Sequence, residues 1–246
     1  MEKIITTEKL TKQYKEVTAI DCIDLSVARG SISALIGKNG AGKTTLMKML
    51  SGLITPTSGV FSICGSDPAS SFPEKQSEKI GILIENAGLL MNMTARDNLR
   101  AKAICAGRED DARIDKLLKL VSLDNQKTKK VKSFSLGMKQ RLGIALALFS
   151  DPEILILDEP MNALDPEGIV ELRNLLLEIN RSGTTIIISS HNLPQVAKIA
   201  TDYIFINIGK IMETISASEL NQRCAEKGID VEEYYLNLNE EVKSHE

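Results

Sequence analysis

The 246-residue sequence lacks the features that mark secreted, disulfide-rich or membrane-spanning proteins. Its four cysteines, Cys22, Cys64, Cys105 and Cys224, form no Cys-x-x-Cys pair, which favours reduced thiols over a disulfide framework or a zinc site. No stretch approaches the ~18 consecutive apolar residues that a membrane span requires. The first residues lack the charged-then-apolar pattern of a signal peptide. We therefore expect a soluble, intracellular protein.

An excess of positive charge is also missing. The sequence holds 30 Lys and Arg against 33 Asp and Glu, a net charge of −3, so no overall basic field attracts nucleic acid and we expect no nucleic-acid partner. The one Lys-rich run, residues 127–132, is compatible with such a contact, but a solvated loop is the interpretation that we favour. The length allows one large domain or a core with a subdomain.

What the sequence does contain is the run Gly-Lys-Asn-Gly-Ala-Gly-Lys-Thr-Thr, which satisfies G-x-x-x-x-G-K-[ST]. An apolar, strand-like stretch precedes it and a helical pattern follows. Strand, glycine turn and helix start together form a nest of N–H groups for a polyphosphate. We predict a nucleoside triphosphate site, with Lys43 on the β- and γ-phosphates and Thr44 on Mg²⁺. The residues expected to line it are Gly37, Lys38, Asn39, Gly40, Ala41, Gly42, Lys43, Thr44 and Thr45.

A second motif consists of a hydrophobic strand that ends in two acids. Residues 154–157 are all apolar, as in a strand buried on both faces of a parallel sheet. Asp158 and Glu159 follow directly, at the carboxyl edge where such sheets place their ligands. We predict that Asp158 is the Mg²⁺ partner of Thr44 and that Glu159 faces the attacking water.

The segment Ser-Phe-Ser-Leu-Gly-Met-Lys-Gln-Arg at 133–141 narrows the class of protein. It resembles the signature of ABC-type ATPases, L-S-G-G-Q followed by a basic residue, Gln and Arg. Ser135 and Gly137 are retained, and they would offer a hydroxyl and N–H groups to an anion at a helix start. Leu136 and Met138 depart from the pattern and, like Phe134, are equally well explained as packing residues. The resemblance runs from about residue 3 to 216, with the motifs in family order.

The resemblance to ABC ATPases implies further site residues. His191 resembles the switch histidine that contacts the γ-phosphate, and Tyr14 the aromatic residue that stacks on adenine. Asp165 resembles the D-loop acid that communicates across a dimer, and it also suits a helix cap before Pro166. Glu85 stands where most relatives have Gln; we predict that it adds a carboxylate ligand for Mg²⁺, the alternative being a solvent-facing strand end.

The predicted fold is α/β: a P-loop NTPase (RecA-like) core with an antiparallel β layer and an inserted helical subdomain. Alternating apolar and polar residues at 1–30 and 56–66 predict the antiparallel layer, and 203–215 reads as a hairpin. Thr94 and Asp97 form a candidate capping box. The parallel strands are expected at 31–36, 80–84, 154–157 and 184–189. The expected divisions are one ABC ATPase domain (1–222) with core segments 1–85 and 151–222, a helical subdomain (86–150) and a C-terminal extension of unassigned role (223–246).

The function implied by the resemblance is ATP hydrolysis in a head-to-tail dimer, where Ser135 and Gly137 of one subunit close the site of the other. The chain would be the ATP-binding subunit of an ABC transporter, held on the inner face of the cell membrane by a separate transmembrane permease. A homodimer and a heterodimer with a second ATPase both remain open. The alternative is a soluble ABC ATPase acting on ribosomes or DNA, but such proteins usually carry paired ATPase domains or long coiled-coil insertions.

Two features bear on cargo and partner. Residues 137–145 and Glu85 resemble exporters of the bacitracin and lantibiotic self-protection type, so we predict export of a peptide antibiotic. The apolar run Leu89–Met91 with Met93 is compatible either with packing within the subdomain or with the lip of a groove for the permease.

Overall fold

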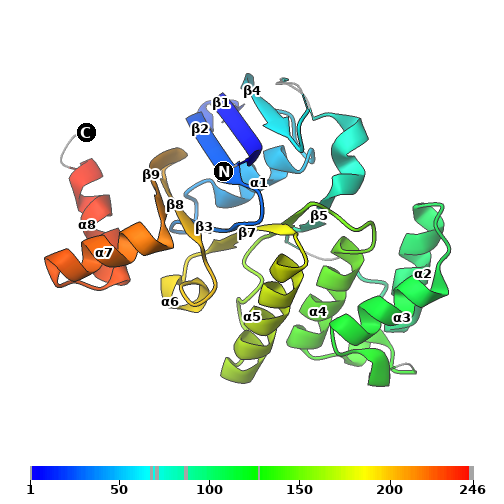
Figure 1. Ribbon diagram of the computed structural model, residues 1–246. Helices are drawn as coiled ribbons and strands as arrows, with labels where there is room; N and C mark the ends of the chain where they lie inside the picture. Colours follow the sequence, from blue (N-terminus) through cyan, green and yellow to red (C-terminus); the bar gives the residue numbers. More distant parts are fainter. Residues whose placement is uncertain (1, 67–68, 70–71, 86–87, 127, 244–246) are drawn as a thin grey trace.

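The structure is a computed structural model that describes residues 2–66, 69, 72–85, 88–126 and 128–243 (Figure 1). Its described strands form two sheets, and most helices lie below the larger one in the view of Figure 1. The strands are β1 (Lys3–Tyr14), β2 (Val17–Ala28), β3 (Ile32–Ile36), β4 (Ser58–Ile63), β5 (Ile80–Leu83), β6 (Ile154–Leu157), β7 (Thr185–Ser190), β8 (Asp202–Asn207) and β9 (Lys210–Ser216). The α-helices are α1 (Lys43–Leu50), α2 (Ala95–Cys105), α3 (Asp111–Leu120), α4 (Leu136–Ala147), α5 (Pro166–Arg181), α6 (Leu193–Val196), α7 (Ala217–Lys227) and α8 (Val231–Lys243). Three 3₁₀ turns are also described: η1 (Glu74–Lys79), η2 (Asp124–Gln126) and η3 (Val131–Ser133).

The larger sheet has the strand order β5-β6-β7-β3-β8-β9 and is parallel except for β9. Strands β3, β6 and β7 are buried along their whole length, because apolar layers cover both faces of the sheet. The four predicted parallel strands are confirmed, and so is the hairpin, whose β8 and β9 turn at Gly209. The carboxyl ends of β3, β6 and β7 therefore meet at one edge.

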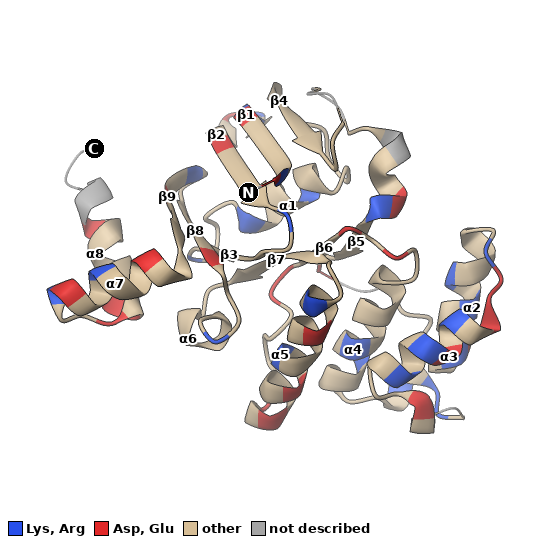
Figure 2. Ribbon diagram, viewed as in Figure 1, with Lys and Arg blue, Asp and Glu red and all other residues tan. Residues whose placement is uncertain are grey.

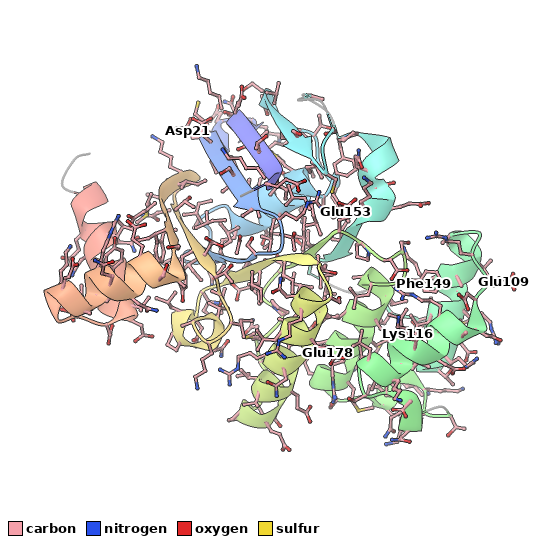
Figure 3. All side chains as sticks on the ribbon, in the orientation of Figure 1. Asp21, Glu109, Lys116, Phe149, Glu153 and Glu178 are labelled. Atoms are coloured by element: carbon pink, nitrogen blue, oxygen red, sulfur yellow. The ribbon has the colours of Figure 1, made fainter. Side chains whose placement is uncertain are left out.

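The smaller sheet, β2-β1-β4, is antiparallel and confirms the predicted β layer. Helix α1 buries Leu46, Met47, Met49 and Leu50 in a core shared with β1, β2 and one face of the larger sheet. Glu153, just before β6 and labelled in Figure 3, links the two sheets: it pairs with Arg29 at 2.6 Å and with Lys79 at 3.0 Å.

Helices α4 and α5 pack against the other face of the larger sheet, α2 and α3 pack on each other and on α4, and all four helices share a second core (Figure 1). Their starts are set by capping side chains. Thr94 and Asp97 form the predicted capping box at α2, Ser135 caps α4 by accepting from the Met138 N–H, and Asp165 caps α5 by accepting from the Gly168 N–H. The segment expected to be helical thus contains α2, α3 and α4, although residues 86–87 and 127 lie outside the described part.

The C-terminal segment folds into α7 and α8, which lie against β8 and β9 (Figure 1). Tyr235 stacks on Phe205 of β8, with ring centroids 5.6 Å apart. Arg223 of α7 reaches Glu213 of β9 at 2.6 Å and the Tyr234 hydroxyl of α8 at 3.0 Å. Helix α7 (Ala217–Lys227) runs across the predicted boundary between residues 222 and 223; the domain boundaries remain a prediction.

Charged residues of both signs are interspersed over the helices and sheets (Figure 2). Among the helices of the described residues, none has the length and apolar character needed to cross a bilayer.

Candidate active site

The phosphate loop joins the end of β3 to the start of α1. Gly42 precedes α1 with φ = 106° and provides no capping side chain, so the first N–H groups of the helix face outward without a side-chain acceptor from the cap residue. Close packing requires the glycines: a Cβ on Gly42 would lie 2.8 Å from the Ala19 carbonyl oxygen, and one on Gly37 would lie 2.4 Å from that of Ile206. The loop borders a cavity of about 400 Å³ that Asn39, Gly40, Ala41, Gly42, Lys43, Thr44 and Thr45 line from one side.

Lys43 lies inside this loop, with a side chain that is only 6% exposed. Its ammonium group donates to the carbonyl oxygens of Gly37 at 2.7 Å and Lys38 at 3.2 Å, and it lies 3.4 Å from Glu159 Oε1. The loop therefore holds a buried positive charge at its centre, where an anionic phosphate would be attracted.

Asp158 follows β6 and brings its carboxylate to the start of α1. The Thr44 hydroxyl donates to Asp158 Oδ2 at 2.7 Å, and the hydroxyl of Ser189, at the end of β7, donates to Oδ1 at 2.5 Å. Thr44 and Asp158, which the sequence separates by more than a hundred residues, are thus adjacent, and their shared role at Mg²⁺ remains a prediction. A hydroxyl and a carboxylate oxygen are hard donors of the kind that Mg²⁺ accepts beside phosphates and water.

Glu159 reaches the same cavity through an unusual backbone conformation, φ = 48°, in the left-handed region. Its Oε2 lies 2.8 Å from His191 Nδ1, which must carry the proton because a carboxylate only accepts. Its Oε1 is buried and has no hydrogen-bond partner among the described residues, apart from the ionic contact with Lys43. A buried oxygen without a partner at the wall of a cavity is placed to accept from a small donor such as water.

Ser135, Gly137 and Asp165 border a different cavity, of about 450 Å³, between the starts of α4 and α5. Leu164 lies beside Gly137, where an added Cβ would meet it at 3.6 Å. This cavity shares no lining residue with the phosphate-loop cavity. A single chain therefore does not bring these three residues to the phosphates.

Tyr14 and Glu85 form no hydrogen bond or ion pair with Lys43, Thr44 or Asp158, and neither lines the phosphate-loop cavity. Tyr14, at the end of β1, is 47% exposed, and the Lys12 ammonium lies 5.0 Å from its ring centroid. The Glu85 carboxylate is 62% exposed and pairs with Lys48 of α1 at 2.6 Å. Their predicted roles as adenine platform and Mg²⁺ ligand remain predictions.

Sequence reasoning missed several residues around the phosphate loop. Val17, Thr18 and Ala19 of β2 line its cavity, together with Ile208 and Gly209 of the β8–β9 turn. They carry no motif, and only the pairing of distant segments places them there. The sequence predicts Ser189 only as part of an apolar strand, yet its hydroxyl bonds to the Asp158 carboxylate and to the Glu159 N–H.

Comparison with known proteins identifies the family. Residues 20–162, more than half of the chain, match the ABC transporter family. The chain belongs to the ABC transporter family. It is the ATP-binding subunit of an ABC transporter and an ATPase.

The relatives of this ABC ATPase include ATP-binding proteins of bacitracin and lantibiotic transport. It is 44% identical over 224 residues to the bacitracin transport ATP-binding protein BcrA of Enterococcus faecalis, covering 91% of this chain and 72% of that protein. It is 42% identical to the lantibiotic transport ATP-binding protein SrtF of Streptococcus pyogenes, covering 85% and 89% of the two chains. The solved dimeric structure of MJ0796, a bacterial ABC transporter cassette, matches with a TM-score of 0.78 at 25% identity, covering 87% and 98%. The α/β fold class predicted from the sequence is confirmed.

Proposed function

We propose that this ABC ATPase drives export of a peptide antibiotic through a separate permease, by hydrolysing ATP at two sites of a head-to-tail dimer. The contact of Glu159 with both His191 and Lys43 carries the catalytic part of the proposal. Similarity to BcrA and SrtF supports the cargo class. The chain would work at the cytoplasmic face of the cell membrane, held there by the permease.

Each residue near the phosphate loop has a proposed task. Lys43 neutralises phosphate charge, and Glu159 accepts a hydrogen bond from the attacking water and orients it for in-line displacement. His191 donates from Nδ1 to Glu159, which keeps the carboxylate in place and leaves the Nε2 side of the ring for the γ-phosphate. Thr44 and Asp158 would hold Mg²⁺, which supplies charge neutralisation at the phosphates when bound.

The separation of the two cavities supports the proposed dimer. Ser135 and Gly137 border a cavity that shares no lining residue with the phosphate loop of their own chain. Their hydroxyl and N–H groups lie at a helix start, which favours an anion. A second subunit in the opposite orientation would bring them to the γ-phosphate, and the dimeric form of the related cassette supports this arrangement. A homodimer is the simpler proposal because every part is present in one chain.

The proposed permease contact is the surface around Leu90, Met91 and Met93. These side chains are 40–46% exposed, although the Asn98 amide holds both backbone groups of Leu90. A cavity of about 590 Å³ between β5, α2 and α4 begins beside Leu90. A fixed backbone that presents flexible apolar side chains suits a docking surface better than internal packing.

Purification of the chain with its co-expressed permease tests the proposal. Leu90→Asp and Met91→Asp should weaken the complex while leaving the thermal midpoint of the isolated ATPase unchanged, and Leu236→Asp on α8, 54% exposed, is the matched control. Vesicles that contain the complex should accumulate labelled bacitracin or lantibiotic only with ATP. If the complex is stable but transports neither peptide, the proposal of peptide-antibiotic export is wrong. If the chain purifies with ribosomes and not with a membrane protein, the alternative of a soluble ABC ATPase is favoured.

A further inference from the structure

We propose that Ser189 is a positioning residue that fixes the orientation of Asp158 relative to Glu159 and thereby sets the Mg²⁺ requirement of the ATPase. The inference rests on the proposed roles of the two acids. Ser189 lies at the end of β7, and its side chain is nearly fully buried, 1% exposed.

One hydroxyl connects the two acids. Ser189 donates to Asp158 Oδ1 at 2.5 Å and accepts from the Glu159 N–H at 2.8 Å. The donor and the acceptor of each of these two hydrogen bonds are fixed, because a backbone N–H only donates, an ionised carboxylate only accepts, and a hydroxyl does both. The β6–β7 register explains the contact: Leu157 lies opposite Ile188, so Asp158 lies level with Ser189.

The bond to Asp158 decides which oxygen faces α1. Rotation of an aspartate carboxylate about its last torsion is only weakly restricted by the side chain itself. Ser189 holds Oδ1, so Oδ2 faces the Thr44 hydroxyl at 2.7 Å. Without Ser189, the carboxylate would have one hydroxyl donor in place of two and would lose its fixed orientation toward Thr44.

The bond to the Glu159 N–H supports a backbone turn. Glu159 has φ = 48°, in the left-handed region that residues with a Cβ adopt uncommonly, so a contact that holds this turn contributes to its stability. That turn directs the Glu159 carboxylate toward His191 and Lys43. The buried Ser189 hydroxyl therefore supports both Asp158, the proposed Mg²⁺ ligand, and Glu159, which is proposed to orient the attacking water.

The neighbouring Ser190 provides a matched control. It is also buried, 4% exposed, and lies on the same strand. Its hydroxyl bonds to the backbone of Asn192, donating to the carbonyl at 3.0 Å and accepting from the N–H at 2.9 Å. The Ser190 hydroxyl forms no hydrogen bond with Asp158 or Glu159. The effect of Ser190→Ala on activity therefore measures the contribution of a serine whose role is structural.

The experiment compares Ser189→Ala and Ser190→Ala in the full chain. Binding of a fluorescent, non-hydrolysable ATP analogue is titrated with and without Mg²⁺, and thermal midpoints, kcat and KM are measured alongside. Ser189→Ala should bind the analogue like wild type without metal, yet need about tenfold more Mg²⁺ for the metal-dependent gain in affinity. Its kcat should fall about 10- to 100-fold, with KM at saturating Mg²⁺ within about threefold of wild type. Ser189→Thr, which keeps the hydroxyl, should recover most of both losses.

The inference would be overturned if Ser189→Ala had the same Mg²⁺ requirement and the same kcat as the wild type. It would also be overturned if Ser190→Ala raised the Mg²⁺ requirement as much as Ser189→Ala does. If the alanine variant does not fold, Ser189→Cys, of similar size but a weaker donor, takes its place in the same comparison. Failure of the proposed function looks different: the wild-type chain would then show no Mg²⁺-dependent hydrolysis, or Glu159→Gln would match it.

Discussion

Lys43 is the residue whose removal should affect nucleotide affinity most directly. Its ammonium group is 6% exposed and already held by the carbonyl oxygens of Gly37 and Lys38. Those bonds aim the charge into the phosphate loop before any nucleotide arrives, so little side-chain entropy remains to be lost on binding. Lys43→Ala removes the phosphate contact and also leaves two loop carbonyls without their donor.

The expected loss follows from one charge-assisted contact in a partly buried place. Such a contact contributes about 1.5–3 kcal/mol, which corresponds to an increase of about 10- to 160-fold in the Kd for ATP. Titration of a fluorescent ATP analogue without Mg²⁺ measures this contact separately from the metal site.

Lys48→Ala is the matched control for this experiment. Lys48 lies on the same helix and carries the same charge, but its ammonium group pairs with Glu85 at 2.6 Å and not with the loop. It should leave the metal-free Kd within about twofold, because a partly exposed ion pair contributes little. Unchanged affinity in Lys43→Ala, or an equal loss in Lys48→Ala, would refute the assigned role of the loop.

Three further predictions concern carboxylates. Glu159→Gln should keep ATP binding, nearly abolish phosphate release and trap an ATP-bound dimer on gel filtration; near-normal turnover would exclude Glu159 as the base. Glu85→Gln should keep the ATPase rate within about fourfold but raise the Mg²⁺ concentration for half-maximal rate, because an amide is a weaker ligand than a carboxylate; an identical titration would leave Glu85 as the partner of Lys48 alone. Hydrogen bonding to Arg29 lowers the pKa of Glu153 below its ordinary value of 4.5, so this pairing stabilises the fold above that pH and is lost as the pH falls through the lowered pKa. Glu153→Gln should therefore reduce the thermal midpoint at neutral pH, by a difference that shrinks in acid, and a pH-independent difference would argue against the ion pair.

Motifs whose conformation depends on residues close together in the sequence were predictable. The spacing of Gly37, Gly42 and Lys43 is that of a phosphate-binding loop. Thr94 and Asp97, within four residues, supply the hydrogen bonds that cap the start of a helix. The apolar run before Asp158 required a buried strand, which the structure has.

Features that depend on tertiary contacts between distant segments were not predictable. Lys48 and Glu85 meet because α1 passes the end of β5, and the sequence carries no sign of that pair. The order of the strands places Ser189 level with Asp158, and the register follows only once β6 and β7 are paired. The docking of α7 and α8 through Tyr234 and Tyr235 likewise depends on where β8 lies.

The phosphate loop is completed by the β8–β9 turn, a segment that is synthesised well after the loop itself. The Gly209 N–H donates to the Ala41 carbonyl at 2.9 Å, and the Gly209 carbonyl accepts from the Asp21 N–H at 2.9 Å. A Cβ on Gly209 would lie 2.7 Å from the Ala19 carbonyl oxygen, so the turn presses directly on β2. A growing chain therefore exposes the Lys43 motif long before the turn that holds the loop in shape has been made. We expect that a ribosome-bound chain that ends before β8 binds no ATP, so that ATP cannot assist the early steps of folding.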